Sequence, residues 1–104
     1  MKAVRVQAAA ALRIDQIYRY SRERWGVARA DAYILGLFGI FEEIAAGEAP
    51  SRPIPADFEV DGYVVGYGKH FVYWKTLDNG DIGIVTVLHE RMHQMDRFRE
   101  DFGA

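Results

Sequence analysis

Two imidazoles and a carboxylate near the end of the chain have the spacing of a zinc site. The pattern His-Glu-x-x-His occupies residues 89–93, with His89, Glu90 and His93 at its fixed positions. On a helix, residues four apart share a face, so both imidazoles could bind one zinc ion while the carboxylate activates a water. The resulting chemistry would be metal-assisted hydrolysis, and it requires this segment to be helical.

The residues before the motif favour a strand instead. Residues 82–88 read Ile-Gly-Ile-Val-Thr-Val-Leu, a short and mostly β-branched run, and a turn-forming Asp-Asn-Gly-Asp precedes them. This combination is typical of the second strand of a hairpin. A zinc site would also need a third ligand, for which the candidates are His70, Asp96 and Glu100. We therefore predict no metal and no cofactor, and keep a zinc-dependent hydrolase as a remote alternative.

A second set of side chains could cleave RNA. Cleavage needs a base for the 2′-hydroxyl, an acid for the leaving oxygen and cations for the developing charge. The candidates are Lys69, His70, Tyr73, Lys75, His89 and Arg91. On an alternating strand Tyr73 and Lys75 share one face and His70 lies on the other, so no single convergent site is predicted. For Tyr73, Trp74 and His89 we favour packing in the core and sheet, with their polar tips satisfied.

Two helices must lie behind these strands. After a short strand at about 3–7, apolar residues recur at helical spacing over 10–25 and again over 30–45. Gly26 separates the two patterns, and so short a link requires an antiparallel pair. Gly36 and Gly39 lie inside the second helix, where each either admits a close neighbour or is merely tolerated.

The second half of the chain reads as a sheet and a short tail helix. Three prolines mark residues 49–56 as an extended connector, and strands are predicted at 63–67, 70–77 and 82–89. Phe58 and Val60 could extend the first of these strands. The tail at 92–102 is predicted to be a helix anchored by Met95, Phe98 and Phe102.

Composition limits the class of protein. The chain has 104 residues, half of them hydrophobic, which predicts a single domain over residues 1–104. The absence of cysteine excludes disulfides, thiolate zinc sites and cysteine nucleophiles, and makes a reducing cytosol the expected compartment. No apolar run is long enough for a signal peptide or a membrane span, so we expect a soluble, cytoplasmic protein.

Charge is unevenly distributed. The net charge of -2 argues against a domain that mainly holds bare nucleic acid, and no membrane contact is expected. Residues 1–30 nevertheless carry seven basic side chains against two acids, whereas residues 42–61 carry six acids against one base. The basic stretch is either an ordinary solvated helix surface or a face for an acidic partner.

Several segments together resemble the ParE branch of the ParE/RelE toxin superfamily, also called plasmid stabilisation proteins. The most specific are Tyr-x-x-x-x-Trp-Gly at 20–26 and Val-Leu-His-x-x-Met at 87–92, with Gly-Lys-His-Phe-Val-Tyr-Trp at 68–74 between them. The match covers nearly the whole chain. The sequence departs from the family at 63–65, where Tyr-Val-Val replaces a common arginine, and at His93, where an acid is frequent.

The resemblance implies an α+β fold, in which an N-terminal strand precedes an antiparallel helix hairpin packed on a twisted, mainly antiparallel sheet with a short C-terminal helix. It also implies a ParD-like antitoxin as partner and DNA gyrase as target, without catalysis. A basic first helix would attract an acidic antitoxin, and the residues we assign to that contact are Arg13, Arg19, Arg22 and Arg24. For the toxic contact we assign the tail residues Arg97, Phe98 and Arg99, unless this tail only caps the sheet.

Two other functions stay open. A RelE-like, ribosome-dependent mRNA endonuclease is the alternative to the gyrase poison. A degenerate toxin that only binds antitoxin, and so acts as a decoy, is the third.

Overall fold

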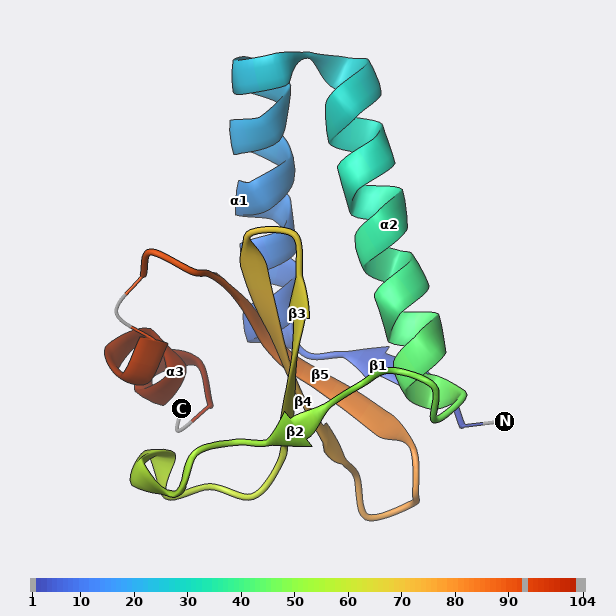
Figure 1. Cartoon of the computed structure of the whole chain (residues 1–104), viewed down its shortest axis with the longest axis vertical. Helices are drawn as coiled ribbons and strands as arrows, with labels where there is room; N and C mark the ends of the chain where they lie inside the picture. The colour runs from blue at the N-terminus through green and yellow to red at the C-terminus, as the bar shows by residue number, and fades with distance from the viewer. Residues whose placement is uncertain (1, 93, 103–104) are drawn as a thin grey trace.

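The computed structural model describes residues 2–92 and 94–102. In chain order the elements are β1 (Val4–Val6), α1 (Ala8–Trp25), α2 (Val27–Ala45), β2 (Arg52–Pro53), a 3-10 turn (Ala56–Phe58), β3 (Tyr63–Tyr67), β4 (His70–Thr76), β5 (Ile82–His89) and α3 (Gln94–Phe102). The long helix hairpin and the short α3 flank one sheet (Figure 1). This confirms the predicted α+β fold class. Within the described residues, no helix has both the length and the apolar character needed to cross a bilayer.

A single residue turns the chain between the two long helices. Gly26 has φ +88°, its N–H donates to the Arg22 carbonyl at 2.9 Å, and its own carbonyl accepts from the Ala30 N–H at 3.1 Å. Glycine adopts this backbone conformation without the steric cost that a Cβ would add. It therefore closes α1 and opens α2, and the helices run antiparallel as predicted (Figure 1).

The five strands lie in the order β1-β5-β4-β3-β2. β1 pairs with β5 in parallel, and the other neighbours are antiparallel. The proline-rich connector supplies the edge strand β2, where Pro53 pairs with Tyr63, and an edge is where a strand tolerates a residue without an N–H.

The prediction that Phe58 and Val60 extend β3 is wrong. Phe58 ends the 3-10 turn, and the next residue, Glu59, has φ +58°. This left-handed backbone interrupts any extended run before Tyr63. At the other predicted boundaries the differences are small, since β4 ends at Thr76 and Leu77 begins the turn.

A bulge changes which residues of β5 face the helices. Tyr73 of β4 pairs with Thr86, but the next residue, Trp74, pairs with Ile84, so Val85 has no partner on β4. Beyond this point the alternation of β5 is shifted by one residue. Val87 consequently lies in the same core cluster as Ile84, under the helix hairpin.

Each face of the sheet has its own core. Under the helix hairpin, Leu37 and Phe41 pack against strand residues such as Val72 and Ile84. On the opposite face Phe98 of α3 is 1% exposed, in a cluster whose other buried members are Ile54, Val64, Tyr73 and Leu88. Phe98 is thus confirmed as an anchor of the tail, while the side chains of Met95 and Phe102 lie outside the described part.

The two glycines of α2 have different surroundings. A Cβ on Gly36 would collide with the Tyr67 hydroxyl, whereas a Cβ on Gly39 would meet nothing within 4 Å. The Tyr67 hydroxyl donates to the Tyr33 carbonyl at 2.7 Å, which fixes it against the helix. Gly36 therefore permits a close approach, and Gly39 is only tolerated.

Candidate functional site

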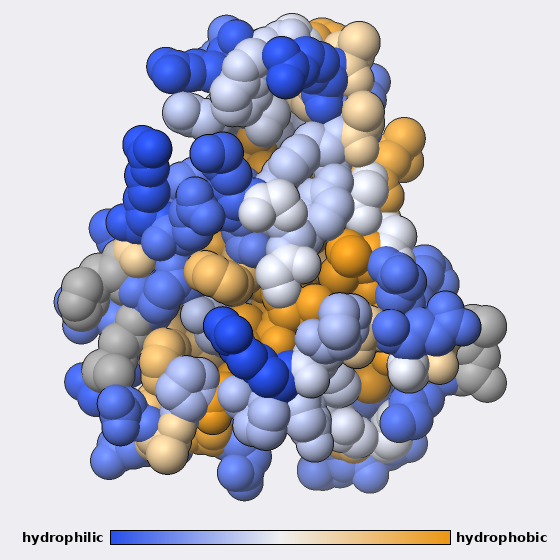
Figure 2. Space-filling model, viewed as in Figure 1, coloured by the Kyte–Doolittle hydropathy of each residue, from blue (hydrophilic) through white to orange (hydrophobic). Residues whose placement is uncertain are grey.

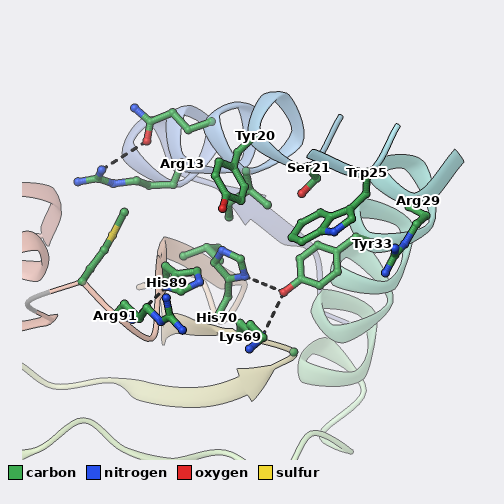
Figure 3. A pocket seen from close by; sticks show the side chains of 15 residues that line it. Arg13, Tyr20, Ser21, Trp25, Arg29, Tyr33, Lys69, His70, His89 and Arg91 are labelled. Carbon is green, nitrogen blue, oxygen red and sulfur yellow. Dashed lines mark hydrogen bonds between the residues drawn. The ribbon is translucent and has the colours of Figure 1, made fainter. Parts of the chain in front are cut away.

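A cavity of about 670 Å³ opens between α1 and the sheet, near the helix turn and the ends of β4 and β5 (Figure 3). Aromatic side chains from the hairpin form its wall, namely Tyr20, Trp25 and Tyr33. Tyr20 is 55% and Trp25 is 49% exposed, although both are large and partly apolar. Exposed aromatic surface next to a cavity is typical of a site that a partner covers. On the face seen in Figure 2, hydrophobic residues are exposed below the hairpin and are surrounded by hydrophilic ones.

The exposed aromatic side chains are held by cations. The Tyr20 and Trp25 rings meet edge to face with centroids 6.0 Å apart. The Arg24 guanidinium lies 5.8 Å from the Tyr20 centroid, and that of Arg29 lies 5.5 Å from the Trp25 centroid. A cation over the face of an aromatic ring is a favourable contact, so these arginines favour the observed orientation of the two rings.

The charge of the cavity has one sign. Four cations line it, Arg13, Arg29, Lys69 and Arg91, and none of its described lining residues is acidic. Arg13 is already paired with Asp101 at 2.8 Å. Lys69 is 70% exposed in its side chain and lies 4.0 Å from Glu90, a weak surface contact. The cavity therefore suits an anionic group with apolar surface beside it.

Two histidines form the floor. His70 and His89 are register partners on β4 and β5, and their rings meet edge to face with centroids 5.1 Å apart. The Tyr33 hydroxyl lies 2.6 Å from Nδ1 of His70 and accepts the Lys69 N–H at 3.3 Å. The Arg91 N–H donates to Nδ1 of His89 at 3.0 Å. Figure 3 shows both rings below the aromatic wall.

Burial, together with the neighbouring His89 imidazole, lowers the pKa of His70 to about 4. Burial also raises the pKa of Tyr33 above its usual value. His70 and Tyr33 are therefore both neutral near pH 7.

The ribonuclease candidates are divided between two places. Four of them line the cavity, namely Lys69, His70, His89 and Arg91. Tyr73 lies on the opposite face of the sheet, 4% exposed, and its hydroxyl donates to Gln94 at 2.8 Å. Lys75 lies at the other end of β4, beside the turn to β5. The packing predicted for Tyr73 and Trp74 is confirmed, since the Trp74 N–H donates to Ser51 at 2.9 Å, but His89 lies at the cavity instead.

The zinc motif does not form one helical face. His89 ends β5 and Glu90 begins a turn, as the strand prediction required, while His93 lies outside the described residues. A search of the described residues finds no cluster of three potential metal ligands.

The four arginines assigned to the antitoxin do not share one surface. Only Arg13 lines the cavity, and its side chain is just 12% exposed. Arg19 pairs with Asp15 at 3.0 Å on the exposed side of α1, and Arg22 lies over the Tyr18 ring. Sequence reasoning missed Arg29, Trp25 and Tyr33 as site residues. The signal for the first two was their position beside Gly26, where the hairpin turns.

The tail residues assigned to the toxic contact also separate. Arg97 and Arg99 are exposed on α3, but Phe98 is buried in the core and is not available to a partner on the folded protein. The tail therefore does cap the sheet, and of the three assigned residues only Arg97 and Arg99 are exposed to a partner.

Comparisons with known proteins agree on one family. Residues 4–94 match the family model described as the ParE toxin of the type II toxin-antitoxin system, parDE. Toxin ParE1 of Mycobacterium tuberculosis H37Rv is 31% identical over 81% of this chain and 85% of its own length. Toxin ParE1 of Caulobacter vibrioides is 33% identical over 89% of this chain and 94% of its own length, and toxin ParE of Escherichia coli is 30% identical over 96% of both.

A solved structure supports the fold. A chain of the chromosomal ParDE system from P. aeruginosa superposes with a TM-score of 0.67 and 15% identity, covering 86% of this chain and 96% of that one. The helix hairpin and the sheet agree with this fold, and the family model and the curated relatives match most of the sequence. This chain therefore belongs to the family of ParE toxins of type II toxin-antitoxin systems.

Proposed function

We propose that this protein is the toxin of a ParDE pair in the cytoplasm, that an acidic segment of a ParD-type antitoxin fills the cavity, and that the released toxin poisons DNA gyrase by protein–protein contact. Family membership supports the toxin role and the antitoxin partner. The observation that carries the antitoxin site is the cavity itself, with exposed aromatic side chains and four cations but no acid among its described lining residues.

The chemistry of the cavity fits an antitoxin segment. Trp, Tyr and Arg are the residue types that dominate binding energy at interfaces. A disordered, acidic segment could fold on this surface, burying the Trp25 and Tyr20 rings and pairing with Lys69 and Arg91. The cations would also speed association with such a partner.

Substitutions at the rim test the antitoxin site. The cognate ParD-type antitoxin should bind the Lys69→Glu/Arg91→Glu double variant at least about tenfold more weakly than the wild type, because two attractions become repulsions. Arg19→Glu/Arg22→Glu is the matched control, since it changes the net charge by the same amount at two exposed cations of α1 outside the cavity. Equal losses in both variants would show that the antitoxin reads overall charge rather than this site.

The toxic contact is made by Arg97 and Arg99, the two exposed arginines of α3. Induced expression should arrest growth with DNA-damage signalling, and the purified toxin should inhibit supercoiling by gyrase. No arrest with retained antitoxin binding would identify a decoy.

One observation favours a second candidate, an mRNA endonuclease: Lys69, His70, His89 and Arg91 gather around one cavity. Rapid loss of translated messages on induction, abolished by His89→Ala, would support it. Growth arrest that persists in His89→Ala, with messages intact, would support the gyrase poison.

A further inference from the structure

The two histidines of the cavity floor both use Nδ1 in a hydrogen bond within the protein. Nδ1 of His89 accepts the Arg91 N–H at 3.0 Å, so the neutral ring carries its proton on Nε2. The Tyr33 hydroxyl has one proton and two acceptors, His70 Nδ1 at 2.6 Å and the Tyr67 carbonyl at 3.3 Å. Nδ1 of His70 therefore either accepts this proton or, when the hydroxyl donates to the Tyr67 carbonyl, donates its own proton to the hydroxyl oxygen. In both rings Nδ1 is engaged within the protein, and Nε2 is the nitrogen left for a bound group.

The charged groups around this pair come from every element packed against it. They are Arg13 from α1 with its partner Asp101 from α3, Arg29 from α2, Lys69 from the β3–β4 turn, and Glu90 and Arg91 after β5. Glu90 is the acid that lies near Lys69, at the rim. Donors and cations thus converge on the floor, and the complementary group is an anion that accepts hydrogen bonds.

We propose that the His70–His89 pair binds a carboxylate side chain of the acidic segment that fills the cavity, and that this carboxylate brings one proton onto the pair. The inference rests on the proposed antitoxin site and names the group that this site recognises. A carboxylate next to an imidazole favours the charged ring, and a segment covering the cavity removes the water that would screen this attraction.

The antitoxin affinity then depends on pH in a defined direction. His70 in the free toxin is neutral near pH 7, since burial lowers its pKa to about 4. In the complex the pKa of the protonated ring is higher, so binding takes up a proton. The affinity rises as the pH falls, by at most about tenfold per pH unit for one proton.

Calorimetric titration with the cognate ParD-type antitoxin tests the proposal between pH 8 and 6. In the wild type the dissociation constant should fall toward pH 6, and the observed enthalpy should vary with the ionisation enthalpy of the buffer. His70→Gln and His89→Gln keep an N–H donor but cannot be protonated, so at least one of them should bind with this pH dependence lost. Arg19→Gln, outside the cavity, should keep it.

Imidazole nitrogen shifts give a second readout that needs no variant. Free toxin at pH 6 should show His70 as a neutral imidazole, and saturation with antitoxin should add one imidazolium ring at the same pH. A wild-type affinity that does not change with pH, or a pH dependence that survives in both glutamine variants, would overturn the carboxylate site while leaving the antitoxin site intact. Absence of binding at every pH would overturn the proposed antitoxin site itself.

Discussion

The guanidinium of Arg13 lies 2.8 Å from the carboxylate of Asp101, which joins α1 to α3 across 88 residues of sequence. Both side chains are only 12% exposed, and the Thr86 hydroxyl donates to the same carboxylate at 2.8 Å. One partly buried ion pair therefore connects α1 of the helix hairpin, strand β5 and the tail helix α3.

Removing one partner of this pair should destabilise the protein. Arg13→Ala leaves the Asp101 carboxylate poorly solvated and unpaired, which costs about 3 kcal/mol of unfolding free energy. Urea denaturation monitored by circular dichroism measures the change. Arg19→Ala removes an ion pair whose side chains are 69% and 52% exposed and should change little. Similar values for the two variants would contradict a special role for the Arg13–Asp101 pair.

Alanine at the two glycines of α2 should have opposite effects. Gly39→Ala adds a helix-favouring residue in open space and should stabilise the protein by about 1 kcal/mol. Gly36→Ala forces the Tyr67 ring away from the helix and breaks its hydrogen bond to the Tyr33 carbonyl, so a net loss of roughly 1–3 kcal/mol is expected. Thermal or urea unfolding of both variants measures the change in unfolding free energy. An increase for Gly36→Ala would show that the Tyr67 ring can move away from the helix without cost.

Substitutions on the two sides of α3 should have different effects, one on stability and the other on binding of the target. Phe98→Ala empties a core position that is 1% exposed and should cost about 3–5 kcal/mol. Arg97→Glu/Arg99→Glu should keep the fold and antitoxin affinity but lose inhibition of gyrase supercoiling. Truncation after Met92 would remove Phe98 and Asp101 together, so it would test folding rather than target binding. Full gyrase inhibition by the double arginine variant would exclude the tail as the toxic contact.

Stability should respond to the protonation of His70. Its pKa is lowered to about 4 in the folded protein, against about 6.5 in an unfolded chain. The unfolded state therefore binds more protons between these values, and stability is lost as the pH falls from about 6.5 toward 4. The difference in unfolding free energy between wild type and His70→Gln isolates this contribution from carboxylate titration. If that difference stays constant between pH 7 and 4, His70 titrates alike in both states.

The helices and strands could be predicted from the sequence, but the face of the sheet on which each residue of β5 lies could not. Glycine at position 26, the β-branched run at 82–88 and the proline-rich connector predict the hairpin, the last strand and the edge, because each depends on local backbone preference. The run at 82–88 has almost no polar residue, so alternation cannot reveal the bulge at Val85. That bulge sets the face on which Val87 and His89 lie.

The residues that line the cavity could be predicted only in part, because their positions depend on contacts between segments far apart in the sequence. Four of the six titratable candidates do line it, but they were assigned to RNA chemistry, and the sequence gives no distance between His70 and His89. The distribution of charge along the sequence points to the arginines of α1. In the structure, three of the four cations that line the cavity, Arg29, Lys69 and Arg91, come from other segments. Long-range pairing decides which cations meet, and a local pattern does not contain that information.

The one-residue link at Gly26 has a mechanical consequence. Because α1 ends at Trp25 and α2 begins at Val27, the two helices cannot separate at that end. The Trp25 ring of one helix and the Arg29 guanidinium of the other are thereby kept in contact at the cavity, so a partner that covers one of them meets both helices at once.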